Sequence, residues 1–221
     1  MVYIVENNGV YGLTKGQFSA TAEKGLELKK QGTNPYLPVD ICMEALISDA
    51  TFIARSFAGN PKHVKELLKA AFSHNGIAVL DIISPCVTFN NHHTAYHSYT
   101  YGKEHEEPLH DITYVAPRNE IVLEDELQAG EVREVPMHDG SVIVLKNLEK
   151  GFDPTSRIEA MRALDEARNN NWLLTGLIYV NPEKPALAET HNLVDTPLNR
   201  LTDAELRPAP EMINKVNALM F

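Results

Sequence analysis

The chain has 221 residues, 43% of them hydrophobic, so it can bury a sizeable core as one large domain or two small ones. Its 20 Lys and Arg residues stand against 30 Asp and Glu, and the net charge of −10 argues against a nucleic-acid backbone as partner. No apolar run approaches the roughly 20 residues that span a bilayer, and the two cysteines, Cys42 and Cys86, cannot build a disulfide framework. These features predict a cytoplasmic protein of a reducing compartment that binds neither nucleic acid nor membranes.

Strands and helices alternate in the first part of the chain. In order, the patterns predict a buried strand at 2–5, a helix at 38–50, a strand at 51–57, a helix at 60–75 and a strand at 77–83. Such alternation is typical of a parallel α/β sheet with helices on its faces.

The later part of the chain is less regular. Residues 141–145 and 173–180 read as strands, while capping boxes at 156–159 and 202–205 each predict the start of a helix. The alternating tyrosines between 96 and 101 suggest an edge strand or part of a substrate lid.

Two loops follow predicted strands and are rich in candidate functional residues. In parallel α/β sheets ligands bind at the carboxyl ends of the strands, which directs attention to residues 6–17 and 84–91. Asn8 offers an uncharged oxygen suited to Mg²⁺, and Gly9, Gly12 and Gly16 allow the backbone to approach a ligand closely. The alternative is an ordinary Asn-Gly turn without a ligand.

Both loops resemble one enzyme family. Residues 6–17, Glu-Asn-Asn-Gly-Val-Tyr-Gly-Leu-Thr-Lys-Gly-Gln, resemble the end of the thiamine-diphosphate motif as it occurs in the β subunit of 2-oxoacid:ferredoxin oxidoreductases of the 2-oxoglutarate and pyruvate type. Residues 84–90, Ser-Pro-Cys-Val-Thr-Phe-Asn, and 173–179 resemble later segments of the same subunit.

The resemblance implies a fold and a domain organisation. We expect the α/β thiamine-diphosphate-binding fold, with a mostly parallel sheet flanked by helices. Residues 1–120 would form the C-terminal part of that domain, and 121–221 a C-terminal extension packing on it. Because family members carry further residues before this point, the chain is expected to be N-terminally truncated, with Met1 as an internal or alternative start.

The family's cofactor residues carry over to the first loop. Asn8 resembles the side-chain ligand of Mg²⁺, and Val10 resembles the residue whose backbone carbonyl is a further ligand; both would link the metal to the diphosphate of the thiamine cofactor. Gly9, Tyr11 and Gly12 would complete the cofactor-binding loop. The family's Mg²⁺-binding Asp has no counterpart in this sequence.

The resemblance also implies a substrate pocket and a cluster ligand. Leu13 and Lys15 resemble pocket residues near the reacting thiazolium, where a cation can meet the carboxylate of the substrate. Cys86 resembles the fourth ligand of a [4Fe–4S] cluster, although a lone cysteine taken by itself is more often a buried structural thiol. Cys42 lies on the apolar stripe of a predicted helix and is expected in the core.

The implied reaction is the oxidative decarboxylation of a 2-oxoacid. The thiazolium attacks the keto carbon, CO₂ leaves, electrons pass singly to the [4Fe–4S] cluster and on to ferredoxin, and coenzyme A takes the acyl group. An acid that assists the cofactor comes from the α subunit in this family, so activity is expected only in a complex. Pocket shape would come from both subunits, so the sequence leaves the particular 2-oxoacid open.

Three alternatives stay open. A thiamine-diphosphate decarboxylase or synthase without iron–sulfur would share the Asn-Asn-Gly loop but give Cys86 no role. An inactive fragment would keep the fold without the site. A metal hydrolase would use the histidines between 92 and 110, but their spacing matches no recognisable zinc site, and solvated loop histidines are the better interpretation.

Overall fold

The computed structural model of the protein describes residues 1–117, 132–147 and 151–220. These residues divide into two compact units, Met1–Lys184 and Pro185–Phe221. The predicted domain boundary at residue 120 lies outside the described residues and stays a prediction. None of the helices that the structure describes combines the length and hydrophobicity needed to cross a bilayer.

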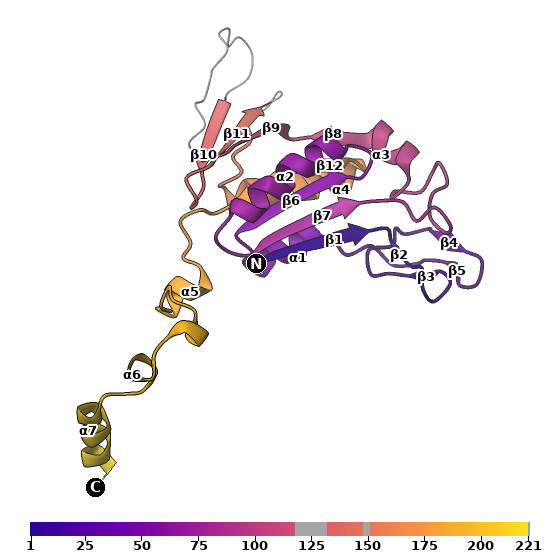
Figure 1. The fold of residues 1–221 in the computed structure, drawn as a ribbon. Helices are drawn as coiled ribbons and strands as arrows, with labels where there is room; N and C mark the ends of the chain where they lie inside the picture. The colour runs from indigo at the N-terminus through magenta and orange to yellow at the C-terminus, as the bar shows by residue number, and fades with distance from the viewer. Residues whose placement is uncertain (118–131, 148–150, 221) are drawn as a thin grey trace. The chain divides into compact units, whose positions relative to one another are not determined.

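A five-stranded sheet in the order β1-β7-β6-β12-β8 lies at the centre of the first unit (Figure 1). Its strands are β1 (Val2–Asn7), β6 (Phe52–Phe57), β7 (Ala78–Ile83), β8 (Glu106–Pro108) and β12 (Leu173–Val180). Strands β1, β7 and β6 run parallel, and β12 runs antiparallel to β6 and parallel to β8. The predicted mostly parallel sheet is therefore confirmed.

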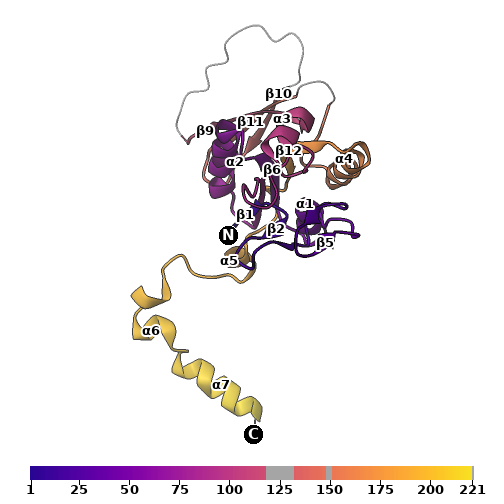
Figure 2. The same ribbon diagram turned by 90° about the vertical axis from the view of Figure 1, so that its right-hand side faces the viewer.

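Three helices flank this sheet, as the periodicity predicted. They are α1 (Ile41–Ile47), α2 (Pro61–Ser73) and α4 (Arg157–Asn170). Figure 2 shows α2 on one side of the sheet and α1 and α4 on the other. Each begins at a side-chain cap, because Asp40, Asn60 and Ser156 accept hydrogen bonds from the backbone N–H groups of Met43, His63 and Glu159.

A second, antiparallel sheet in the order β10-β11-β9 packs with α2 over one face of the central sheet. It comprises β9 (His110–Val115), β10 (Val132–Pro136) and β11 (Val142–Asn147). Two small hairpins pair β2 (Val10–Tyr11) with β3 (Gln17–Phe18) and β4 (Glu27–Leu28) with β5 (Gly32–Thr33). The tyrosine-rich segment forms helix α3 (Tyr99–His105), capped by Ser98, so the edge-strand interpretation was wrong.

Strand β1 departs from the expectation of a buried strand. It is the edge of the central sheet and pairs only with β7 in the described part of the chain. The side chains of Tyr3 and Ile4 are 60% and 43% exposed. An apolar β-branched strand is buried only where strands on both sides cover it. In the described part of the chain, β1 has a neighbouring strand, β7, on one side.

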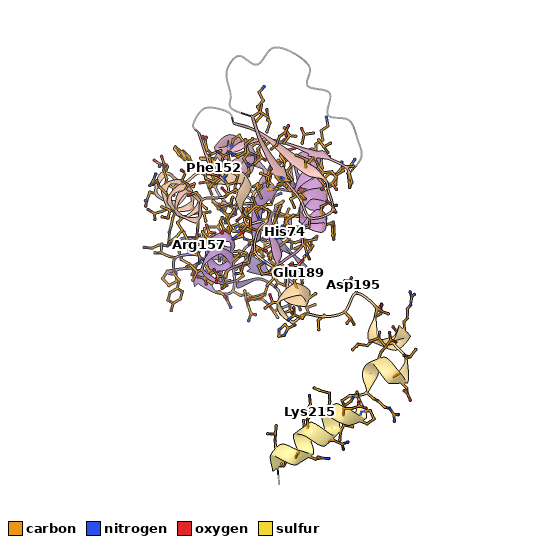
Figure 3. All side chains as sticks on the ribbon, turned by 90° about the vertical axis from the view of Figure 1, so that its left-hand side faces the viewer. His74, Phe152, Arg157, Glu189, Asp195 and Lys215 are labelled. Atoms are coloured by element: carbon orange, nitrogen blue, oxygen red, sulfur yellow. The ribbon has the colours of Figure 1, made fainter. Side chains whose placement is uncertain are left out.

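The second unit contains short helices, and none of its described residues, 185–220, is buried. The helices are α5 (Leu187–Thr190), the 3₁₀ helix η1 (Leu198–Arg200), α6 (Asp203–Leu206) and α7 (Pro210–Met220). The predicted capping box at Thr202 and Glu205 is confirmed at the start of α6. Figure 3 shows the side chain of Lys215 standing out from α7.

A buried histidine in the first unit makes stability depend on pH. His74, labelled in Figure 3, is 6% exposed. The Nε2 of its imidazole lies 2.7 Å from the Thr51 hydroxyl. Burial, together with the charge of His138, lowers the pKa of His74 from its ordinary 6.5 to about 4. Between these two values the unfolded chain binds the proton and the folded protein does not, so stability falls as the pH drops from about 6.5 towards 4.

Replacing His74 with glutamine tests this prediction. The variant keeps a hydrogen-bonding group near Thr51 but cannot titrate, so we expect a shallower decline of the urea midpoint across that pH range. An equally steep decline in both proteins would show that other groups carry the pH dependence.

Candidate cofactor site

The structure brings the two signature loops together. Strands β1 and β7 are parallel neighbours, so the loop after Asn7 and the loop after Ile83 leave the same edge of the sheet. The backbone N–H of Ser84 donates to the carbonyl of Asn7 at 2.8 Å, and the side-chain amide of Asn90 donates to the carbonyl of Asn8 at 3.1 Å. Residues that lie about eighty positions apart thus form one surface at the carboxyl ends of the strands.

Asn8 begins a tight turn at this edge. Its Oδ1 accepts a hydrogen bond from the backbone N–H of Val10 at 3.1 Å, and Gly9 has a φ of 72°. Asn8 is half-buried and Val10 is buried. The turn offers an amide oxygen and peptide carbonyls, which are hard ligands of the type that Mg²⁺ prefers.

The remaining loop residues form the tip of the β2–β3 hairpin. Lys15 has a φ of 69°, and the side chain of Leu13 is 98% exposed. Tyr11, Gly12 and Lys15 are exposed as well. A pocket around Leu13 and Lys15 would therefore need a second surface from outside the described part of this chain, and their substrate role stays a prediction.

A cavity of about 460 Å³ opens beside this edge, on the side of the sheet that carries α1 and α4. Its lining includes polar side chains at the strand ends and an apolar wall from α4 and the segment before α1. These are Asn7, Thr21, Glu23, Asp40, Arg55, Asp81, Tyr96 and His97 on the polar side, and Leu37, Val39, Ile41, Leu164, Ala167 and Trp172 on the other. Asn7 lines the cavity, whereas Asn8, Val10, Leu13 and Lys15 are not part of its lining.

A buried ion network forms the polar side of the cavity. Arg55 is 5% exposed, its Nε donates to Asp81 at 2.9 Å and its Nη2 donates to Asp40 at 2.6 Å. Asp81 also accepts a hydrogen bond from the side chain of Asn7 at 3.1 Å, and Thr21 donates to Asn7 at 2.6 Å. The network thus connects the N-cap of α1 to the residue next to Asn8.

Each charge in this network depends on the others. Burial works against the ionised form of Asp40, but the guanidinium of Arg55 holds the pKa of that carboxyl below its ordinary value. Burial likewise opposes the charge of Arg55, and the neighbouring carboxylates, Asp40 foremost, raise its pKa above the usual value. This network was not predicted from the sequence, although a charged residue inside each of two apolar strands, Arg55 in β6 and Asp81 in β7, is a visible signal.

Glu23 and His97 form a second hydrogen-bonded pair, and the ring of His97 packs against Gly9. The Nδ1 of His97 is 3.1 Å from Oε2 of Glu23, whose Oε1 accepts the backbone N–H of Tyr96. Burial opposes ionisation of Glu23, but its hydrogen bond with His97 and the charge of His97 bring the pKa of Glu23 below the ordinary value. His97 is 1% exposed and His110 is 4% exposed. The expectation of solvated histidines therefore holds for His92 and His93 and was wrong for these two.

The two cysteines lie in different surroundings, and both are free. Cys42 is fully buried among the side chains between α1, α4 and the sheet, where burial raises the pKa of its thiol, so its predicted core position is confirmed. Cys86 is half-buried beside the β2–β3 hairpin, against Phe18 and Phe89. Within the described residues no group of three or more His, Cys, Asp or Glu side chains is arranged to hold a metal ion.

Several known proteins are similar to this chain. Residues 1–82 match the family described as "Thiamine pyrophosphate enzyme, C-terminal TPP binding domain". The 2-oxoacid:ferredoxin oxidoreductase subunit beta of Saccharolobus solfataricus is 46% identical over 96 residues, which are 42% of this chain and 31% of that protein. The chain is similar to the β subunits of 2-oxoacid:ferredoxin oxidoreductases.

Two further relatives extend this likeness to 2-oxoacid:ferredoxin oxidoreductases of the 2-oxoglutarate type. The 2-oxoglutarate oxidoreductase subunit KorB of Mycobacterium tuberculosis is 39% identical over 89 residues, 38% of this chain and 23% of that protein. The structure of 2-oxoglutarate:ferredoxin oxidoreductase from Magnetococcus marinus, with 2-oxoglutarate, coenzyme A and succinyl-CoA bound, matches with a TM-score of 0.62 at 26% identity. That match covers 99% of this chain and 57% of the other.

The fold of the chain is therefore the α/β thiamine-diphosphate-binding fold predicted from the sequence. The matched segments span about a third or less of the curated relatives' own length.

The residues of this site fit Mg²⁺ bound to a diphosphate better than they fit a [4Fe–4S] cluster. The turn at Asn8 supplies oxygen donors and leaves most positions around a magnesium ion to phosphate and water, which suits Mg²⁺ bound to a diphosphate. A [4Fe–4S] cluster needs four ligands of the thiolate type, and the sequence holds two cysteines, one of which is fully buried in the core. Cys86 can therefore supply one ligand, and a cluster there would take the others from outside this sequence.

Proposed function

We propose that the chain acts as part of the β subunit of a 2-oxoacid:ferredoxin oxidoreductase, with 2-oxoglutarate as the favoured substrate. The observation that carries this proposal is the hydrogen-bonded contact between the Asn8 turn and the loop of Cys86 at the carboxyl ends of β1 and β7. The names of the similar proteins support the same reaction class. The reaction would convert a 2-oxoacid and coenzyme A to an acyl-CoA and CO₂, with the electrons leaving through a [4Fe–4S] cluster to ferredoxin.

The roles proposed for this chain are those of binding and orientation. Asn8, through its side chain, and Val10, through its carbonyl, would hold Mg²⁺ against the diphosphate, and Gly9 would let the backbone come close. Bound thiamine diphosphate supplies the carbon nucleophile that attacks the keto carbon of the substrate. Lys15 is exposed at the tip of a hairpin, where its ammonium group can meet a substrate carboxylate that another subunit presents.

We infer that an α subunit is the partner of this chain. Leu13, Lys15 and Tyr11 stand on a hairpin tip whose apolar and charged side chains are exposed, so a pocket forms only when another surface covers them. The complex would work in the cytoplasm with ferredoxin as electron acceptor.

Co-expression with the α subunit tests the proposed function. We expect the purified complex to reduce ferredoxin only when 2-oxoglutarate, coenzyme A and thiamine diphosphate with Mg²⁺ are all present. Replacing Lys15 with methionine should lower activity mainly through KM for the 2-oxoacid. A complex that forms but releases an aldehyde from the 2-oxoacid without reducing ferredoxin would favour a thiamine-diphosphate decarboxylase instead.

The isolated chain provides a second test. We expect no micromolar binding of thiamine diphosphate with Mg²⁺ in a calorimetric titration of the chain alone. The diphosphate is anionic and the protein carries a net charge of −10, while the turn contributes one side-chain oxygen and one carbonyl to the metal. Micromolar binding to the isolated chain would indicate a self-contained site and a different thiamine enzyme.

A further inference from the structure

Asn90 makes hydrogen bonds to both signature loops at once. Its backbone N–H donates to the carbonyl of Cys86 at 2.7 Å, and the two residues form an isolated antiparallel bridge. Its side-chain Nδ2 donates to the carbonyl of Asn8 at 3.1 Å. The residue is fully buried, so water does not compete for these bonds.

The chemistry at this position favours an amide specifically. A carbonyl oxygen, that of Asn8, faces the side chain, and only the amide nitrogen of Asn90 can donate to it. An aspartate of the same shape would place a carboxylate oxygen against that carbonyl. The other amide atom, Oδ1 of Asn90, is buried and has no hydrogen-bond partner in the described part of the chain.

Gly9, in the turn at Asn8, packs closely against the side chains of His97 and Asn90. A Cβ atom on Gly9 would lie 2.9 Å from Nδ1 and Cε1 of His97 and 3.1 Å from Nδ2 of Asn90. His97 is itself held by Glu23, so the surface against which Gly9 packs is rigidly supported. Asn8, Gly9 and Val10 can therefore shift little toward the protein interior.

We propose that Asn90 is a positioning residue that holds the Asn8 turn at a fixed place relative to Cys86. Its backbone N–H bonds the carbonyl of Cys86 and its side-chain amide bonds the carbonyl of Asn8. The few covalent bonds between these two groups of Asn90 fix the separation of the two loops. The proposal rests on the proposed function only for what the turn and the thiol bind, namely Mg²⁺ with a diphosphate and an iron–sulfur cluster. A displacement of about 1 Å between reacting groups can lower a reaction rate about 100-fold. A fixed distance between the Asn8 turn and Cys86 would prevent such a displacement.

Amide hydrogen exchange on the chain itself measures this role directly. The reporting amides are those of Val10, which donates to Asn8 Oδ1, and of Ser19, which donates to the carbonyl of Gly9. In Asn90→Ala and in the isosteric Asn90→Asp we expect both amides to exchange about tenfold faster, as the loss of one buried hydrogen bond implies. Amides of Ala54 and Leu80, in the centre of β6 and β7, serve as internal references and should keep their protection.

The neighbouring residue supplies a matched control. Asn91 is exposed and accepts a hydrogen bond from Tyr99, away from the Asn8 turn, so Asn91→Ala should leave Val10 and Ser19 unchanged. Unchanged exchange at both amides in a folded Asn90→Ala or Asn90→Asp variant would overturn the proposal. If the alanine variant loses the reference protection as well, the aspartate variant carries the test, since it keeps the side-chain volume.

Two further measurements separate this role from the proposed function. Cys86→Ser should leave the exchange of Val10 and Ser19 unchanged, because Asn90 bonds the backbone carbonyl of Cys86 and not its thiol. In the complex with the α subunit, Asn90→Ala should weaken Mn²⁺ binding in the presence of thiamine diphosphate about tenfold, read by electron paramagnetic resonance. A wild-type complex that binds no Mn²⁺ would contradict the proposed function, while the exchange result would still decide the role of Asn90.

Discussion

Replacing Arg55 with methionine is expected to lower the free energy of unfolding by about 3–5 kcal/mol, the usual cost of leaving buried charges uncompensated. Asp81 is 1% exposed and loses the ion pair with the Nε of Arg55, and Asp40 loses the ion pair with the Nη2 of the same guanidinium. The side-chain amide of Asn7 still donates to Asp81, but a neutral amide does not replace the positive charge of the guanidinium. Urea unfolding followed by circular dichroism measures the loss.

Two control variants sharpen this prediction. Lys69→Met removes an exposed ion pair with Glu66 on α2 and should cost at most about 1 kcal/mol. The double variant Arg55→Met with Asp81→Leu should recover much of the lost stability, because the fully buried carboxylate is then removed and the carboxylate still left without the guanidinium, that of Asp40, is 27% exposed. A loss for Arg55→Met as small as that for Lys69→Met would show that the network contributes little.

Replacing Asn8 with alanine is expected to weaken Mg²⁺ binding in the assembled complex by at least about 100-fold, the upper range found even for residues that only support a metal ligand. The substitution removes the side-chain oxygen and the hydrogen bond that shapes the turn at Val10. Activity with 2-oxoglutarate should fall in parallel, and a high concentration of Mg²⁺ should restore part of it.

Asn170→Ala is a matched control for this experiment. Asn170 is exposed at the end of α4, and its side-chain amide donates to the carbonyl of Glu166 at 2.9 Å, so its removal should leave the affinity for Mg²⁺ unchanged. Equal affinities for Mg²⁺ in Asn8→Ala and wild type would remove Asn8 from the metal site.

Several corrections to the sequence-based predictions share one physical origin. His97 and the tyrosines around it read as a polar surface segment, yet His97 packs behind Gly9 and Tyr99 begins a helix. Strand β1 read as buried, yet it lies at the edge of the sheet. Composition reports the average environment of a residue type, whereas burial depends on which elements come to cover it.

The sequence by itself determined the alternation of strands and helices up to Ile83, the caps at Asn60 and Ser156, and the two loops of the candidate site. These features depend on hydrophobic periodicity and on hydrogen bonds between residues close in the chain, so a local pattern encodes them. Only the tertiary structure decided that Arg55 meets residues 15 and 26 positions away, and that Asn90 bonds a carbonyl 82 positions earlier. A charge inside an apolar strand is visible in the sequence, but its partner is not, because the partner is set by the order and register of the strands, which arise from the packing of the whole sheet.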